Sequence, residues 1–484
     1  MTDSLLDLDA RALAAALRHG PSTVADHLVA VLDRIAALDP QHLAFSQLNP
    51  GASRDAEALD RRPPAEREEL PLFGVPVAIK EELDVAGLVT TLGTSANTGP
   101  AAVDSEVVAR LRAAGAVVVG KTHMPEFGQA PFTDGAWGAT RNPVAPGRSS
   151  GGSSGGSAVA VATRMVPVAI GGDAGGSVRI PSAWCGIVGL KPTRGRVPGE
   201  SGIASLAGLA VGGPLGRSVG DVALLLDGMV SGPNRYALRA PNDLGLQASG
   251  SYVDSLEVPH RPLRIGWNTW SPWSTNYEIA VDRQVNQVFE DTLSAAAELG
   301  HEVEHVDPSP APTYFESFRA VWMASAASLP FPDAALDALE PLTAWLVRTG
   351  RSRPAADLPR ALAALKQFES QIIADYLPYD LILTPLLAMT PRPTGWFDAA
   401  DGERNFMQQC QFTPFTSYVN VAGLPALSMP VGMSEGVSGS ESPLPIGVQA
   451  IGRSGQESTL LRFALDMERY FGWDTRVPPA VSGM

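Results

Sequence analysis

Two serines in glycine-rich surroundings are the residues of this sequence best suited to nucleophilic chemistry. Ser153 lies in the run GGSSGG at 151–156, and Ser177 ends the run GGDAGGS at 171–177. Glycine allows sharp backbone turns and leaves successive N–H groups unobstructed, as a site for a developing oxyanion requires. A serine hydroxyl becomes a good nucleophile only when a base takes up its proton. The two serines therefore predict a base near them in the folded chain.

Lys80 is the candidate for that base. No histidine occurs between residues 146 and 200, whereas Lys80 directly follows the apolar run VPVAI at 75–79. Four of the 36 basic residues are lysines, so arginine is the usual positive charge of this chain, although codon usage alone could leave a few lysines. Burial can hold a lysine neutral, while arginine keeps its proton. A nucleophilic system made of Lys80, Ser153 and Ser177 would then need no histidine as its base.

The elements around these residues follow an α/β pattern. Residues 75–79 and 116–119 are expected to be strands on either side of a helix at 106–114, which is a βαβ unit. Further strands are expected at 263–266, 302–304, 380–385 and 427–430, and helices within 5–38, 281–299 and 315–375.

The glycine- and serine-rich segment at 146–176 could by itself be a flexible linker. Apolar residues at 158–162 and 166–170 favour a tight backbone site instead, because they indicate buried elements between the glycines. After this segment, Ile180-Pro181 predicts a helix with proline at its first position. The positive end of that helix would lie near Ser177 and favour an anion there.

Length and composition limit the classes of protein that remain. The chain has 484 residues, of which 45% are hydrophobic and 18% charged, so it can bury a large core. Its formal charge of −15 argues against a nucleic-acid partner or an anionic membrane. We expect a cytoplasmic protein, because the sequence shows no signal peptide, no spanning apolar stretch and two distant cysteines. The histidines and cysteines have no metal-binding spacing.

Several motifs resemble the amidase signature family. They include GVPVAIKEELDV at 74–85 and GGDAGGSVRIPSAWCGIVGLKPT at 171–193, with intervals of 73 residues from Lys80 to Ser153 and 24 from Ser153 to Ser177. The resemblance extends to GATRNP (138–143), TP (384–385), NVAGLPALSMPVG (420–432) and LPIGVQAIG (444–452). It covers most of the chain and is weakest at 1–60 and 305–375.

The resemblance implies a fold and an organisation. The family fold is a single three-layer α/β/α domain with a large mixed central sheet, here spanning residues 1–484. Within it we expect an N-terminal helical region at 1–70. A helical insertion at 305–375 is expected to form the pocket or its lid.

The resemblance also implies roles for individual residues. Ser177 would be the acylated nucleophile and Lys80 the general base. Ser153 would be the bridging serine, which the family holds in a cis peptide. The backbone N–H groups expected to form the oxyanion hole are those of Ala174, Gly175, Gly176 and Ser177.

Residues next to these are expected to support the site rather than react. Ser154, Asp173 and Arg179 would fix the glycine loop. Ala174 stands where the family often has a hydroxyl residue, and its N–H remains available. Cys185 is expected to pack in the helix after the nucleophile, and Lys121 and Lys191 are expected to be structural. Residues expected to line the substrate pocket are Phe127, Gln129, Trp137 and Trp322.

The predicted reaction is hydrolysis of a carboxylic amide, with esters and carbamates as further substrates. The resemblance implies no metal and no organic cofactor, and either a monomer or a homodimer fits the sequence. The apolar content of 305–375 suggests a pocket for an apolar or aryl group, or simply helices that pack against one another.

Two other functions fit parts of the sequence. The run GGSSG also fits the G-x-S-x-G turn of an α/β-hydrolase, which would need a histidine downstream. The candidates are His260, His301 and His305, of which the last two are expected in surface turns. Alternatively, the same machinery could release ammonia from glutamine in a subunit of a tRNA-dependent amidotransferase.

Overall fold

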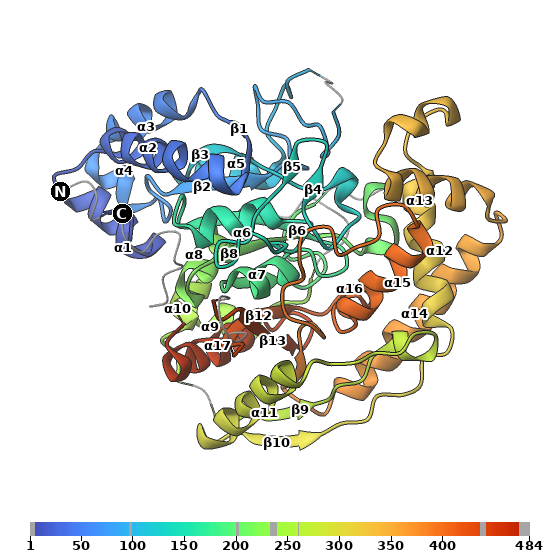
Figure 1. The fold of residues 1–484 in the computed structure, drawn as a ribbon. Helices are drawn as coiled ribbons and strands as arrows, with labels where there is room; N and C mark the ends of the chain where they lie inside the picture. Colours follow the sequence, from blue (N-terminus) through green and yellow to red (C-terminus); the bar gives the residue numbers. More distant parts are fainter. Residues whose placement is uncertain are drawn as a thin grey trace.

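A mixed sheet of eleven strands forms the centre of the molecule (Figure 1). The computed structural model describes residues 5–95, 99–199, 203–232, 240–259, 261–435 and 442–473. Within these ranges the strand order is β1-β3-β2-β6-β8-β7-β12-β13-β11-β9-β10. The strands are β1 (Phe45–Leu48), β2 (Pro76–Lys80), β3 (Val117–Thr122), β6 (Val168–Asp173), β7 (Val188–Lys191), β8 (Val211–Gly216), β9 (Arg264–Trp267), β10 (Glu302–His305), β11 (Leu381–Pro385), β12 (Ala426–Met433) and β13 (Pro445–Gly452). A separate hairpin consists of β4 (Asp134–Gly135) and β5 (Gly138–Ala139).

Helices cover both faces of this sheet. Val77 and Ile79 of β2 belong to a core shared with α5, α8, α11 and α17, whereas Ala78 between them faces a second core with α2, α3, α6 and α7. This alternation is that of a strand buried on both faces. The helices are α1 (Ala10–His19), α2 (Val24–His42), α3 (Ala52–Asp60), α4 (Pro64–Glu68), α5 (Glu106–Ala113), α6 (Gly155–Ala162), α7 (Arg179–Cys185), α8 (Val219–Val230), α9 (Leu244–Ser249), α10 (Tyr252–Ser255), α11 (Arg283–Glu298), α12 (Tyr314–Ala327), α13 (Pro341–Ser352), α14 (Asp357–Tyr376), α15 (Gly402–Phe412), α16 (Ser417–Ala422) and α17 (Glu457–Phe471). The predicted three-layer α/β/α fold is confirmed.

Parallel pairing of β2 with β6 brings Lys80 close to the glycine loop that follows β6. Ile79 of β2 lies opposite Ile170 of β6. Carboxyl ends of neighbouring parallel strands lie at the same edge of a sheet. Lys80 at the end of β2 therefore lies near Gly172 at the end of β6.

β13, the last strand along the chain, lies in the interior of the sheet. β13 lies between β12 and β11 and pairs antiparallel with both. It thus joins the strands on the β1 side of the sheet to β11, β9 and β10.

The helical segment at 305–375 forms one side of the molecule. It contains α12, α13 and α14, which lie together in golden yellow to light orange at the right of Figure 1, and the short 3₁₀ helix η5 (Asp333–Ala338). Its apolar side chains pack with α15 and α16. No described helix is long and apolar enough to cross a membrane.

The predicted elements agree with the structure in most places. The βαβ unit is present as β2, α5 and β3. The N-terminal region at 1–70 is not purely helical, because β1 pairs with β3 at the sheet edge. The helix after the nucleophile begins at Arg179, so Pro181 is its third residue rather than its first.

His27 makes the stability of the fold sensitive to acid. It is buried in α2, and neither ring nitrogen has a hydrogen-bond partner among the described residues. Burial, with a smaller contribution from Arg34, lowers the pKa of His27 from 6.5 to about 4. The unfolded chain therefore binds this proton first as the pH falls, and folding loses about 3 kcal/mol between these two values.

His27→Leu should remove this loss. The difference in melting temperature between the variant and the wild type is expected to shift in favour of the variant as the pH is lowered from 7 to about 4. Thermal unfolding followed by circular dichroism at several pH values measures the difference. A difference that stays constant across this range would contradict a neutral buried His27.

Candidate active site

Lys80 and Ser153 are joined by a buried hydrogen bond. Lys80 Nζ donates to Ser153 Oγ at 2.8 Å, and it also lies 3.3 Å from the carbonyl oxygen of Gly172. The exposed fraction of each of the two residues is 1%. The amine is therefore placed to exchange a proton with the Ser153 hydroxyl without water between them.

Ser153 and Ser177 lie on two loops that contact each other. The peptide bond between Gly152 and Ser153 is cis, as the family resemblance implies. The N–H of the next residue, Ser154, donates to the carbonyl oxygen of Ser177 at 3.2 Å. The Ser154 hydroxyl also bonds the backbone of Gly172 at 3.2 Å. Ser154 thus links the loop before α6 to the loop after β6.

A buried ion pair holds the glycine loop after β6. Arg179 forms two hydrogen bonds of 2.9 Å with the Asp173 carboxylate. That carboxylate also accepts the N–H groups of Gly176 at 2.8 Å and Val178 at 3.2 Å. Burial by itself raises the pKa of Asp173, but the Arg179 guanidinium outweighs it and holds this pKa well below the usual range. The loop is therefore fixed around a permanent negative charge.

Two residues from the C-terminal part of the chain form hydrogen bonds with this ion pair. Asn420 of α16 accepts from Arg179 at 2.6 Å and donates to Asp173, while Gln449 of β13 accepts from Arg179 at 2.5 Å. Thr416 donates to the carbonyl oxygen of Gly175 at 2.6 Å. The orientation of the glycine loop thus depends on segments more than 230 residues away in the sequence.

The predicted oxyanion hole has one donor fewer than expected, because the Gly176 N–H already has an acceptor. The Gly176 N–H is occupied by Asp173 and cannot also bind an oxyanion. Among the described residues, no acceptor is found for the N–H groups of Ala174, Gly175 and Ser177. Gly176 instead contributes its backbone conformation, with a φ of +130° that L side chains rarely adopt.

Glu82 is a charged neighbour of Lys80 that the sequence reasoning missed. Its Oε1 lies 3.4 Å from Lys80 Nζ, and the side chain is partly exposed. A Cβ atom at Gly172 would come within 1.8 Å of the same oxygen. Glycine is therefore required at 172 for the carboxylate to reach this position.

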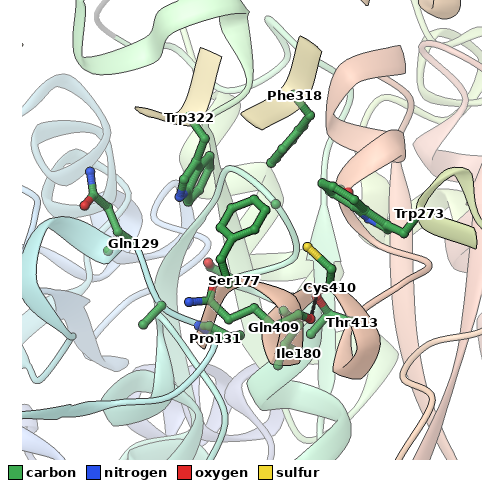
Figure 2. Close-up of a pocket in the computed structure, with 15 residues that line it drawn as sticks. Gln129, Pro131, Ser177, Ile180, Trp273, Phe318, Trp322, Gln409, Cys410 and Thr413 are labelled. Carbon is green, nitrogen blue, oxygen red and sulfur yellow. Dashed lines mark hydrogen bonds between the residues drawn. The ribbon is translucent and has the colours of Figure 1, made fainter. Parts of the chain in front are cut away.

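A pocket opens in front of Ser177. It encloses about 490 Å³ of empty space, part of it open to solvent. The Ser177 hydroxyl forms no hydrogen bond within the described ranges, so it is free to face a ligand. Most of the wall is apolar or aromatic, as Figure 2 shows, and includes Ile180, Trp273, Phe318, Trp322, Phe406 and Cys410.

Two of the four predicted pocket residues line this cavity. Gln129 and Trp322 are part of its wall. The prediction for Phe127 and Trp137 is wrong for this pocket. Phe127 packs edge-on against Phe331, and the Trp137 ring stacks on that of His123 with centroids 3.6 Å apart.

Trp273, Phe318, Phe406 and Cys410 were not predicted as pocket residues. Each is far from Ser177 in the sequence, and their apolar character fits an ordinary core equally well. Burial raises the pKa of the Cys410 thiol well above its usual value. The pocket wall therefore presents a neutral thiol rather than a thiolate.

Lys121, Lys191 and Cys185 lie in buried structural positions. Lys121 donates to the Val89 carbonyl at 3.0 Å and pairs with Glu81. Lys191 donates to the Pro192 carbonyl at 2.9 Å, and burial, together with Arg179, lowers its pKa to about 7. Cys185 is buried in α7, where burial raises the pKa of its thiol.

The two described histidines that an α/β-hydrolase could use lie far from Ser153 in the sheet order. His305 is in β10 at one end of the sheet order, His301 directly precedes it, and six strands separate β10 from β6. His301 is buried and accepts from the Leu263 N–H at 3.1 Å, which corrects the expectation of a surface turn. His260 lies outside the described residues.

Comparison with known proteins covers nearly the whole chain. A family model described as Amidase matches residues 26–461. The chain is 37% identical over 473 residues to the putative amidase AmiB2 of Mycobacterium tuberculosis (strain ATCC 25618 / H37Rv), with 97% of each chain covered. It is 35% identical over 468 residues to a glutamyl-tRNA(Gln) amidotransferase subunit of Thermus thermophilus, covering 91% of this chain and 92% of that one.

A solved structure is also similar over its full length. It is a 6-aminohexanoate cyclic dimer hydrolase complexed with substrate, with a TM-score of 0.86 and 30% sequence identity. The similarity covers 99% of this chain and 100% of that one.

Proposed function

Because the chain belongs to the amidase signature family, and is thus a hydrolase of C–N bonds, we propose that it cleaves a carboxylic amide through an acyl-enzyme on Ser177. The observation that carries the proposal is the buried 2.8 Å hydrogen bond from Lys80 to Ser153, on a loop that contacts the Ser177 loop. This arrangement supplies a base without histidine.

The proposed mechanism is a proton relay. Neutral Lys80 takes a proton from Ser153, Ser153 takes one from Ser177, and Ser177 Oγ attacks the amide carbonyl carbon. The second transfer needs a Ser153–Ser177 contact that forms when substrate binds, since catalytic hydrogen bonds are often long in unliganded enzymes. We assign stabilisation of the tetrahedral oxyanion to the N–H groups of Ala174, Gly175 and Ser177.

Collapse of the tetrahedral intermediate releases the amine. The relay runs backwards, so the proton taken from Ser177 reaches the leaving nitrogen as the C–N bond breaks. Water then attacks the acyl-enzyme, and Ser177 regains its proton when the carboxylic acid leaves. Glu82, whose Oε1 lies 3.4 Å from Lys80 Nζ, is the charged neighbour of the amine that passes these protons.

The pocket supports substrates with an apolar or aryl group. Trp273, Phe318, Trp322 and Phe406 offer aromatic surface around Ser177. Esters and carbamates would enter the same acylation step. We further propose that the protein acts in the cytoplasm, as a monomer or homodimer, without nucleic acid or membrane.

Hydrolysis of a panel of chromogenic anilides, esters and aryl carbamates by the purified protein tests this proposal. We expect cleavage with no partner protein added, and intact-mass detection of an acyl adduct on Ser177 with a slowly released carbamate. The identity to the glutamyl-tRNA(Gln) amidotransferase protein supports a second candidate. Inertness toward the whole panel, with ammonia released from glutamine once partner proteins are supplied, would replace the first function by the second.

A further inference from the structure

A second cavity adjoins the pocket at Ser177 and contains three carboxylates. It encloses about 770 Å³, part of it open to solvent, and shares Gln129 and Ala130 with the first pocket. The carboxylates belong to Glu126 of the 3₁₀ helix η2 (Glu126–Gly128), Asp134 of β4 and Glu340, which directly precedes α13. A ligand extending from Ser177 past Gln129 would therefore reach these acidic side chains.

Gln129 has a buried acceptor that is unpaired within the described part of the chain. Its exposed fraction is 7%, and its Oε1 has no hydrogen-bond partner among the described residues. In the same part of the structure, Asp134 Oδ1 is likewise buried without a partner. Buried acceptors are nearly always paired, because an unpaired one loses its hydration without compensation. Both oxygens are thus suited to a ligand that donates hydrogen bonds.

The charge of this cavity indicates a cationic ligand. In the described chain, no basic nitrogen lies within 4.0 Å of the carboxylates of Glu126, Asp134 or Glu340. Burial, and then repulsion from Glu340, raise the pKa of Asp134 to about 6. Burial also raises the pKa of Glu126, which accepts the Glu340 N–H at 2.9 Å. A bound cation would replace this repulsion by attraction.

The unpaired oxygens of Gln129 and Asp134 need hydrogen-bond donors, and an ammonium group supplies them. A primary ammonium group has three N–H donors and can bond an amide oxygen and carboxylates at once. Within the described residues, no group of three or more His, Cys, Asp or Glu side chains is placed to hold a metal ion. An organic cation therefore matches both the charge and the Gln129 acceptor.

We propose that Glu126, Gln129, Asp134 and Glu340 form an acidic subsite that binds the primary ammonium group of an amide substrate whose carbonyl lies at Ser177. This inference rests on the proposed function and specifies its substrate class as amides with an aminoalkyl chain. The aromatic pocket and the acidic subsite would then hold opposite ends of one molecule.

Anilides of ω-aminoalkanoic acids, compared with uncharged alkanoic anilides of equal chain length, test the acidic subsite. At neutral pH and low salt, wild type is expected to prefer the ammonium substrate by at least about tenfold in kcat/KM at the best chain length. Asp134→Asn and Glu340→Gln should each lower this ratio several-fold. Asp337→Asn should leave the ratio unchanged, because Asp337 is an exposed carboxylate that pairs with Arg348.

The outcomes separate this inference from the proposed function. If uncharged anilides are cleaved and the ratio stays near one at every length, the acidic subsite is wrong while the amidase function stands. If no anilide is cleaved, calorimetric titration of wild type and Asp134→Asn with an ω-aminoalkyl amide decides. Binding that the variant loses supports the subsite, and equal or absent binding overturns it.

Discussion

Ser177→Ala is expected to lower kcat/KM for an anilide by at least about 10⁴-fold, to the background rate. The variant lacks the oxygen that is proposed to form the acyl bond, while the pocket wall and the glycine loop remain. Ser153→Ala and Lys80→Met should cause losses of similar size, because each would interrupt the same proposed relay. Their effects should not add in double variants, since groups that act as a unit fail together. Steady-state kinetics with one anilide measures all of these values.

Ser182→Ala is the matched control for Ser177→Ala. Ser182 lies in α7 and its hydroxyl bonds only the Val178 carbonyl, at 2.8 Å, among the described residues. Its loss should change kcat/KM by less than about threefold. Retention of anilide hydrolysis by Ser177→Ala, at more than about a hundredth of the wild-type rate, would exclude Ser177 as the nucleophile.

Arg179→Met is expected to lower the free energy of unfolding by about 3 to 5 kcal/mol. Both Arg179 and Asp173 are fully buried, so the variant leaves a carboxylate without its counter-ion. Asn420 and Gln449 lose a donor as well. Because the same carboxylate holds the Gly176 N–H, the activity of the folded variant should also fall. Urea unfolding and anilide kinetics provide the two measurements.

Two further variants distinguish the cause of this instability. Arg348→Met removes an exposed ion pair with Asp337 and should cost less than about 1 kcal/mol. Asp173→Leu combined with Arg179→Met removes both buried charges and should be more stable than Arg179→Met alone. If the double variant is less stable than the single one, loss of packing rather than an uncompensated charge is the cause.

The fold class could be predicted from the sequence because the family resemblance rests on contiguous motifs, and the residues proposed to react lie in the same motifs. The apolar run before Lys80 and the glycines around Ser153 and Ser177 are contiguous signals. Strands such as β2, β9 and β11 were predicted from short apolar runs. β8 was not predicted, because its residues, VGGPLG, contain three glycines and a proline and lack any apolar alternation.

The pocket wall depends on long-range packing that local patterns do not contain. Phe318 and Phe406 come from α12 and α15, and nothing in either helix indicates that it faces Ser177. Trp137 was predicted as a pocket residue without any motif that would place it there. In the structure its ring is occupied by stacking on His123. Engagement of the Gly176 N–H by Asp173 likewise requires knowledge of the loop conformation.

The position of β13 has a consequence for synthesis of the protein. A ribosome makes Lys80, Ser153 and Ser177 in the first half of the chain, but β13 and Gln449 emerge near its end. Until β13 enters between β12 and β11, the sheet exists as two separate parts and Arg179 lacks one of its acceptors. We therefore expect the nascent chain to stay inactive until nearly all of it has been translated, and a premature stop before residue 445 to yield no working amidase.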